Sequence, residues 1–109
     1  MFVRWKRRQL RSGHDVSHDA VIVESRWRNG ATQQRFVCYV ACIRERYLTA
    51  PAHRDLFWRQ AEERLNKIEL SPDTRRIIEA RLADVVPRPS EEELSQVNIT
   101  RTMFERFDS

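Results

Sequence analysis

Histidine and cysteine side chains at short spacing are the first candidates for chemistry in this chain. His14 and His18 are four residues apart, and so are Cys38 and Cys42. A zinc ion would need such side chains within one tetrahedral site, yet two cysteines four apart on one strand are separated by about 13 Å, which also exceeds disulfide reach. The chain has no Cys-x-x-Cys or His-Glu-x-x-His pattern. We therefore predict no metal site and interpret both cysteines as reduced core thiols.

Three acidic residues are the candidates for catalysis of the kind that metal-dependent nucleases perform. Asp15, Asp19 and Glu24 lie in the N-terminal half, but no nucleophile or base accompanies them at a recognisable spacing. The chain has only 2 glycines, and it lacks a phosphate-binding loop, a dinucleotide motif and a nucleophile elbow. We therefore predict that the protein is not an enzyme and needs no cofactor.

Tryptophans between basic residues form a third candidate, a surface that stacks unpaired bases. The two stretches are Arg4-Trp5-Lys6 and Arg26-Trp27-Arg28. Neighbouring residues of a strand point to opposite faces, so arginines that face solvent would leave the tryptophans facing the core. We favour core tryptophans with outward basic side chains.

The basic side chains themselves are the predicted nucleic-acid site. We expect the cations of the sheet to contact phosphates, with Arg4, Lys6, Arg26, Arg28 and Arg35 projecting from a single face. The full predicted set is Arg4, Lys6, Arg7, Arg8, Arg26, Arg28 and Arg35. The alternative is that these charges only solvate an exposed sheet and protect its edge strands.

Composition and charge are consistent with one small domain. The chain has 109 residues, of which 40% are hydrophobic and 33% charged, enough for one modest core. No stretch is apolar enough to be a leader or a membrane span, so we expect a cytoplasmic protein without membrane contact. Residues 1–50 hold 10 Lys and Arg against 4 Asp and Glu, whereas residues 51–109 hold 10 against 12. The basic half suits nucleic acid or an acidic protein surface as the partner.

A hairpin is the element that must position the N-terminal side chains. Asn29-Gly30 is typical of a two-residue type I′ turn between strands. Such a turn predicts four facing pairs: Val23 with Phe36, Ile22 with Val37, Val21 with Cys38, and Glu24 with Arg35. It also predicts one core face, formed by Val21, Val23, Trp27, Phe36, Cys38, Val40 and Cys42. Residues 2–8 alternate as a third strand, and residues 9–19 read as a loop.

Helical periodicity replaces strand alternation after Pro51. Phe57, Ala61, Leu65 and Ile68 share one stripe of a helix expected at residues 52–69. Ser71-Pro72-Asp73 starts a second helix with its apolar stripe at Ile77, Ile78, Leu82 and Val85, and Pro87 ends it. Ser90 and Glu93 have the spacing of a capping box for a third helix, which is less defined at residues 97–100.

These elements predict an α+β fold in one domain, residues 1–109. A three-stranded antiparallel β-meander (residues 1–46) would pack on two or three C-terminal helices (residues 51–109).

The N-terminal segment resembles the opening region of bacterial insertion-sequence transposases of the DDE type, and small stand-alone bacterial and phage proteins that share this opening. The resemblance covers roughly residues 1–45 and rests on Phe2-Val3-Arg4, Val21-Ile22-Val23-Glu24-Ser25-Arg26, Asn29-Gly30, Gln34-Arg35-Phe36-Val37 and Tyr39. It implies a mobile-element setting and contact with DNA or with other subunits. It does not imply transposition, because the catalytic domain that would supply the acidic triad is absent.

Two functions from different classes follow from these observations. The first is a non-enzymatic accessory protein of a bacterium, phage or mobile element that binds DNA or RNA through its arginine-rich sheet face. The second is a small protein-binding module or inhibitor, such as a phage anti-defence protein, that docks on a nucleic-acid-processing complex through its acidic side chains, Glu62, Glu63 and Glu91-Glu92-Glu93. A homodimer, formed through a hairpin edge or an exposed Trp58, is compatible with either function.

Overall fold

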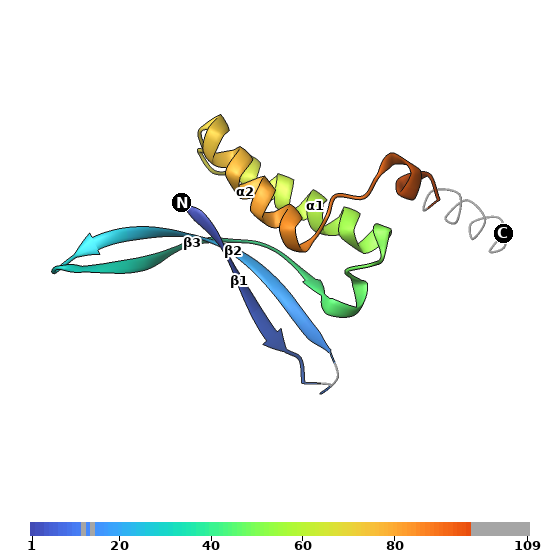
Figure 1. The fold of residues 1–109 in the computed structure, drawn as a ribbon, viewed down its shortest axis with the longest axis horizontal. Helices are drawn as coiled ribbons and strands as arrows, with labels where there is room; N and C mark the ends of the chain where they lie inside the picture. Colours follow the sequence, from blue (N-terminus) through green and yellow to red (C-terminus); the bar gives the residue numbers. More distant parts are fainter. Residues whose placement is uncertain (12, 14, 97–109) are drawn as a thin grey trace.

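The strands and helices follow the chain in the order that the sequence predicts. The computed structural model describes residues 1–11, 13 and 15–96. Its elements are β1 (Phe2–Gln9), β2 (Val16–Arg28), β3 (Ala31–Arg44), a 3₁₀ turn (Glu45–Tyr47), α1 (Pro51–Asn66) and α2 (Pro72–Val85). Residues 91–96 are also helical. Figure 1 shows the strands in one layer and both helices on one side of it. The predicted α+β class is confirmed.

The three strands form the predicted antiparallel meander, in the order β1-β2-β3. The connection between β1 and β2 is shorter than predicted, because residues 16–19 belong to β2 and not to a loop. Lys6 pairs with Asp19 and Arg8 with Ser17. Backbone pairing with β1 extends β2 through residues 16–19, whose sequence has no strand pattern.

The hairpin turn and the register next to it agree with the prediction. Asn29 and Gly30 both have positive φ, 54° and 76°, as a type I′ turn requires. The ladder near the turn contains the expected pairs, Val23 with Phe36 and Glu24 with Arg35.

Two β-bulges change the register farther from the turn. β3 carries an extra residue at Val37 and another at Val40, neither of which has a partner on β2. Ile22 therefore pairs with Cys38 and Val21 with Tyr39, so the predicted pairs of these two residues are wrong.

The bulges decide which residues of β3 face the helices. Each extra residue reverses the alternation, so that a nearly continuous apolar run packs on the helices: Val37, Cys38, Val40, Ala41 and Ile43. Ala20 and Ile22 face the same side from β2 and are completely buried.

The predicted core face is correspondingly wrong in part. Cys38 and Val40 do pack on the helices, but Phe36 is 57% exposed, Trp27 is 75% exposed and Cys42 is also exposed. Val21 and Val23 are buried, yet they alternate with Ile22 and so lie on the opposite face of the sheet.

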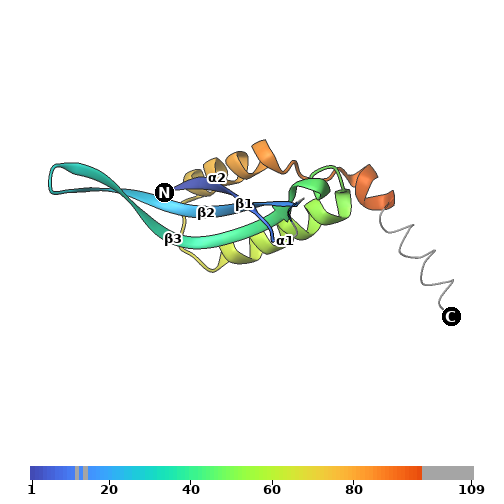
Figure 2. The same ribbon diagram turned by 90° about the horizontal axis from the view of Figure 1, so that it is seen from below.

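Helix α1 covers the β3 side of the sheet and α2 the β1 side. In Figure 2 the uncovered face of the sheet is toward the viewer and the helices lie behind it. Phe57, Ala61 and Leu65 are buried, as their spacing predicts, and the Trp5 ring stacks on Phe57 at 5.9 Å between centroids. Trp5 is therefore a core residue, as expected.

Trp58 is only 3% exposed, so the expectation of an exposed Trp58 at a dimer contact is wrong. Its indole N–H donates to the carbonyl of Val86 at 2.8 Å, and the Arg88 guanidinium lies over its ring at 3.8 Å. The segment that follows α2 is thereby fixed on α1.

Helix α2 begins and ends as predicted. The Ser71 hydroxyl accepts a hydrogen bond from the backbone N–H of Thr74 at 3.2 Å, and Pro72 occupies the first turn. Ile78 and Leu82 are buried, whereas Ile77 is exposed and does not belong to the core stripe.

The predicted capping box is present at the next helical segment. Ser90 N–H donates to the Glu93 carboxylate at 3.2 Å, and Glu93 N–H donates to the Ser90 hydroxyl at 3.1 Å. The buried Arg54 of α1 pairs with the same Glu93 carboxylate and donates to the carbonyl of Pro87 at 3.3 Å. The predicted irregularity at residues 97–100 lies outside the described residues.

No helix in the described part of the chain combines the length and apolarity that a bilayer span requires.

Candidate nucleic-acid interface

The β2–β3 hairpin extends beyond the rest of the sheet as a two-stranded arm, residues 24–35. β1 pairs with β2 only as far as Val23, which is opposite Phe2, so the arm has no third strand. Five residue pairs and the Asn29-Gly30 turn make the arm about 17 Å long at about 3.4 Å per residue. Figure 1 shows it projecting away from both helices.

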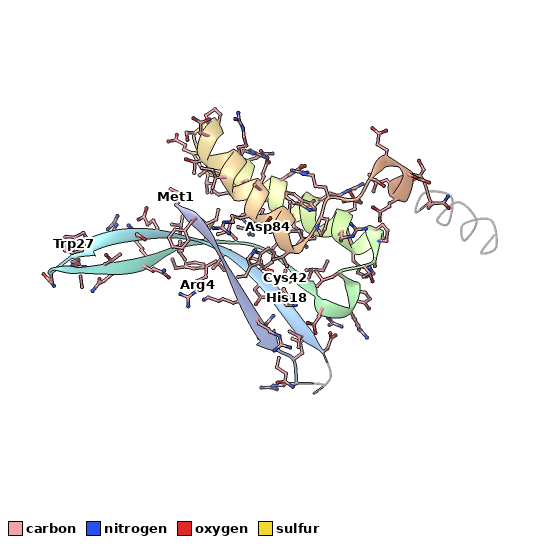
Figure 3. The ribbon with its side chains drawn as sticks, in the orientation of Figure 1. Met1, Arg4, His18, Trp27, Cys42 and Asp84 are labelled. Atoms are coloured by element: carbon pink, nitrogen blue, oxygen red, sulfur yellow. The ribbon has the colours of Figure 1, made fainter. Side chains whose placement is uncertain are left out.

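The arm carries an exposed aromatic side chain beside several arginines. Trp27, near the tip, points into solvent far from the helices (Figure 3). A surface hollow of about 540 Å³ is lined by Arg26, Trp27, Arg28, Gln33, Gln34 and Arg35. This combination can contact phosphates through the guanidinium groups and a base or sugar through the indole.

The Glu24 carboxylate forms ion pairs with two of these arginines. Glu24 lies 3.2 Å from Arg26 and 3.5 Å from Arg35, and both guanidinium groups remain mostly exposed. Exposed pairs of this kind contribute only about 0–1 kcal/mol to stability. Arg28 has no acidic partner within the part of the chain that the structure describes. The arm therefore presents three arginines against one glutamate, with a net positive charge.

The uncovered face of the sheet contains four cross-strand rows, since residues at one register position point to the same side. The rows are Phe2, Val23 and Phe36; Arg4, Val21 and Tyr39; Lys6, Asp19 and Cys42; and Arg8, Ser17 and Arg44. Of the described elements, no helix lies on this face.

Arg4 spans this face from one edge strand to the other. Its Nη1 donates to Oε1 of Gln34 at 3.0 Å, although Arg4 is on β1 and Gln34 on β3. The side chain must cross the central strand close to Val23, which explains why that residue is only 4% exposed on a face without a helix. Figure 3 shows Arg4 below the crossing of the strands, with both helices above.

Tyr39 lies in a polar part of the same face. Burial, followed by a hydrogen bond with Cys42 and the nearby Asp19 carboxylate, raises the pKa of Tyr39, while Arg8 opposes the shift. Arg8 itself pairs with Asp19 at 3.3 Å. The phenol is therefore neutral at physiological pH and retains its O–H as a donor.

The five basic residues expected on a single face do not share one, and the seven predicted site residues are divided between the two sides of the sheet. Arg4, Lys6 and Arg8 align with odd-numbered residues of β2, and they project from the uncovered face. Arg26 and Arg28 are even-numbered residues of β2, and Arg35 is opposite the even-numbered Glu24. The side chains of these three arginines therefore project from the other side of the β2–β3 ladder. Arg7, opposite His18, is exposed but also belongs to that opposite side. The structure thus contains two basic groups, one on β1 and one on the arm.

Two of the candidate metal and catalytic residues have separate charged neighbours. The Asp15 carboxylate lies 3.4 Å from both Arg44 and Arg46, and the His18 imidazole lies 3.6 Å from the Glu45 carboxylate. Across the described residues, no three His, Cys, Asp or Glu side chains gather as a metal-binding group. His14 lies outside those residues.

Most glutamates on which the protein-binding alternative depends already form ion pairs within the protein. Glu62 pairs with Arg88 at 2.7 Å, Glu63 with Lys67 at 3.4 Å, and Glu93 with Arg54. Of the five glutamates in these stretches, Glu91 and Glu92 have no ion pair with a described residue.

Trp27 is the functional candidate whose environment the sequence misled us about. Strand alternation indicated a core position, but the helices and β1 end before the arm begins. The difference in strand length explains the exposure: β1 has eight residues, whereas β2 and β3 have 13 and 14. β1 therefore cannot pair along the whole hairpin, and the end that carries Trp27 has no third strand beside it.

A scan against protein-family models matched no family, and searches of curated proteins and of solved structures likewise found no match.

Proposed function

We propose that this chain is a nucleic-acid-binding accessory protein without a reaction of its own. The observation that carries the proposal is the projecting basic arm, which exposes Trp27 on one side of the ribbon and Arg26 and Arg28 on the other. The resemblance of residues 1–45 to the opening region of DDE transposases supports the same class of partner.

The dimensions of the arm suit a nucleic-acid groove. A two-stranded β-ribbon fits the major groove of duplex DNA, which is about 12 Å wide. Arginines on a narrow ribbon can reach phosphates, and binding releases the counterions that surround them. Arg28, which has no acidic partner in the described residues, can bind a phosphate without breaking an internal ion pair.

Fluorescence anisotropy with labelled duplex and single-stranded oligonucleotides, across a salt series, tests this function. Replacing Arg26, Arg28 and Arg35 with Glu should abolish binding at physiological salt. Replacing each with Gln should lower the slope of log affinity against log salt by about one per lost phosphate contact. The arm is exposed, so circular dichroism should show that the fold persists.

A matched control separates local contact from overall charge. Arg59, Arg76 and Arg81 are exposed arginines on the helices, and their replacement with Glu changes the net charge equally. This control should retain most of the affinity. The proposal that the arm binds nucleic acid would be contradicted if the arm variant and the helix variant lost affinity equally. It would also be contradicted if the arm variant folded and kept its affinity.

A further inference from the structure

We propose that the uncovered face of the sheet binds single-stranded nucleic acid, with unpaired bases stacking on Phe36 and Tyr39 and phosphates lying along the basic side chains of β1. This inference rests on the proposed function and adds a second contact, for single strands, to the duplex contact proposed for the arm. It uses a surface separate from the arm arginines.

Exposed aromatic rings on this face are the first observation. Phe36 is 57% exposed and Tyr39 39% exposed. The described helices α1 and α2 lie on the other face of the sheet (Figure 2). Phe36 is in the same row as Phe2, and Tyr39 is in the adjacent row. Aromatic rings on an open sheet are stacking surfaces that accept any base, because every base has a π-face.

The spacing of the rows favours a single strand over a duplex. Adjacent rows on one face are about 7 Å apart, twice the rise of about 3.4 Å between stacked bases. Bases can match this spacing only when they are separated from one another, and a duplex keeps its bases inside the stack.

Cations flank the rings on both edges of the sheet. Arg4, Lys6 and Arg8 project from β1, and Lys6 has no ion pair within the described residues. At the β3 edge, a hollow of about 230 Å³ is lined by Tyr39, Val40 and Cys42 together with Gln60, Glu63, Arg64 and Lys67 of α1. Lys67 pairs with Glu63 at 3.4 Å, which leaves Arg64 as the cation without an ion pair among the described residues of this hollow. A strand that crosses the rings would therefore have positive charge on either side.

Charge also argues against a second copy of this chain as the occupant. Three cations on β1 oppose one carboxylate on this face, Asp19, which already pairs with Arg8. Two such faces brought together would repel each other, whereas a polyanion with apolar bases complements both properties.

Abasic oligonucleotides give the decisive test, because they keep the phosphates and remove the bases. The full-length protein should bind a single-stranded 12-mer at least about ten-fold more tightly than its abasic counterpart. Phe36→Ala with Tyr39→Ala should remove most of this difference and leave duplex affinity nearly unchanged. The control variant, Leu56→Ala with Ile77→Ala, removes two exposed apolar side chains from the helices and should change neither.

The outcomes distinguish this inference from the proposed function. Equal affinity of the unaltered protein for the two 12-mers, with duplex binding retained, would overturn the stacking face and leave the arm assignment intact. Absence of binding to every oligonucleotide would overturn both. Sedimentation provides the remaining check: a dimer that dissociates in the Phe36 and Tyr39 variant, with oligonucleotide affinities unchanged, would identify the face as a protein interface and overturn the inference.

Discussion

The indole N–H of Trp58 donates a hydrogen bond to the Val86 carbonyl, and this bond joins α1 to the segment that follows α2. Trp58 is almost fully buried, so a variant that lost the donor would leave the carbonyl without a partner. The Arg88 guanidinium stacked on the same ring adds a second interaction to this junction.

We expect Trp58→Phe to lower the free energy of unfolding by about 1–3 kcal/mol, because it removes this donor and weakens the cation–π contact. Urea unfolding followed by circular dichroism would measure the loss. Trp27→Phe, at an exposed position, should change stability by less than about 0.5 kcal/mol. Similar losses for the two variants would contradict the buried junction.

The C-terminal capping box should make stability depend on acid. The hydrogen bond from the Ser90 backbone N–H lowers the pKa of Glu93, and the Arg54 guanidinium lowers it further, whereas partial desolvation acts in the opposite direction. Because the pKa is lower in the folded protein, the stabilisation is present above the ordinary carboxyl range and disappears as pH falls through the folded pKa. Thermal unfolding between pH 6 and pH 3 should therefore be more pH-dependent in the unaltered protein than in Glu93→Gln. Parallel profiles would show that this carboxylate is not linked to folding.

The two thiols should differ in reactivity. Cys42 is exposed, whereas burial raises the pKa of Cys38, an effect that Arg64 partly offsets. A thiol-specific reagent at neutral pH should modify one cysteine quickly in the native protein and both in urea. Cys42→Ser should abolish the fast phase; a fast phase that persists would show that Cys38 is accessible.

The turn of the arm should depend on its glycine. Gly30 has a φ of 76°, and an added Cβ would meet no atom within 4 Å, so the cost of Gly30→Ala comes from the backbone alone. We expect a loss of about 1 kcal/mol, confined to the arm. Amide hydrogen exchange should accelerate in residues 24–35 and stay unchanged in α1. Ser25→Ala, on the same arm, should have little effect, and an unchanged arm in Gly30→Ala would contradict the turn geometry.

Local patterns in the sequence predicted the elements whose stability depends on nearby residues. The Asn29-Gly30 turn, the cap at Ser71 and the box formed by Ser90 and Glu93 each depend on residues at most three apart. Such interactions can be recognised from spacing alone, because the backbone geometry of a turn or cap is the same in any protein. The two helices and the meander were predictable for the same reason.

The faces of the strands were decided by packing between distant segments. The bulges at Val37 and Val40 allow β3 to direct a nearly continuous apolar run toward α1, and no local pattern announces them. They place Phe36 and Tyr39 on the uncovered face, while the short β1 leaves Trp27 on a free arm. The sequence by itself thus determined the elements and the positive charge of the first half. Only the tertiary structure decided which aromatic rings reach solvent and which cations lie beside them, because burial depends on where helices and neighbouring strands end.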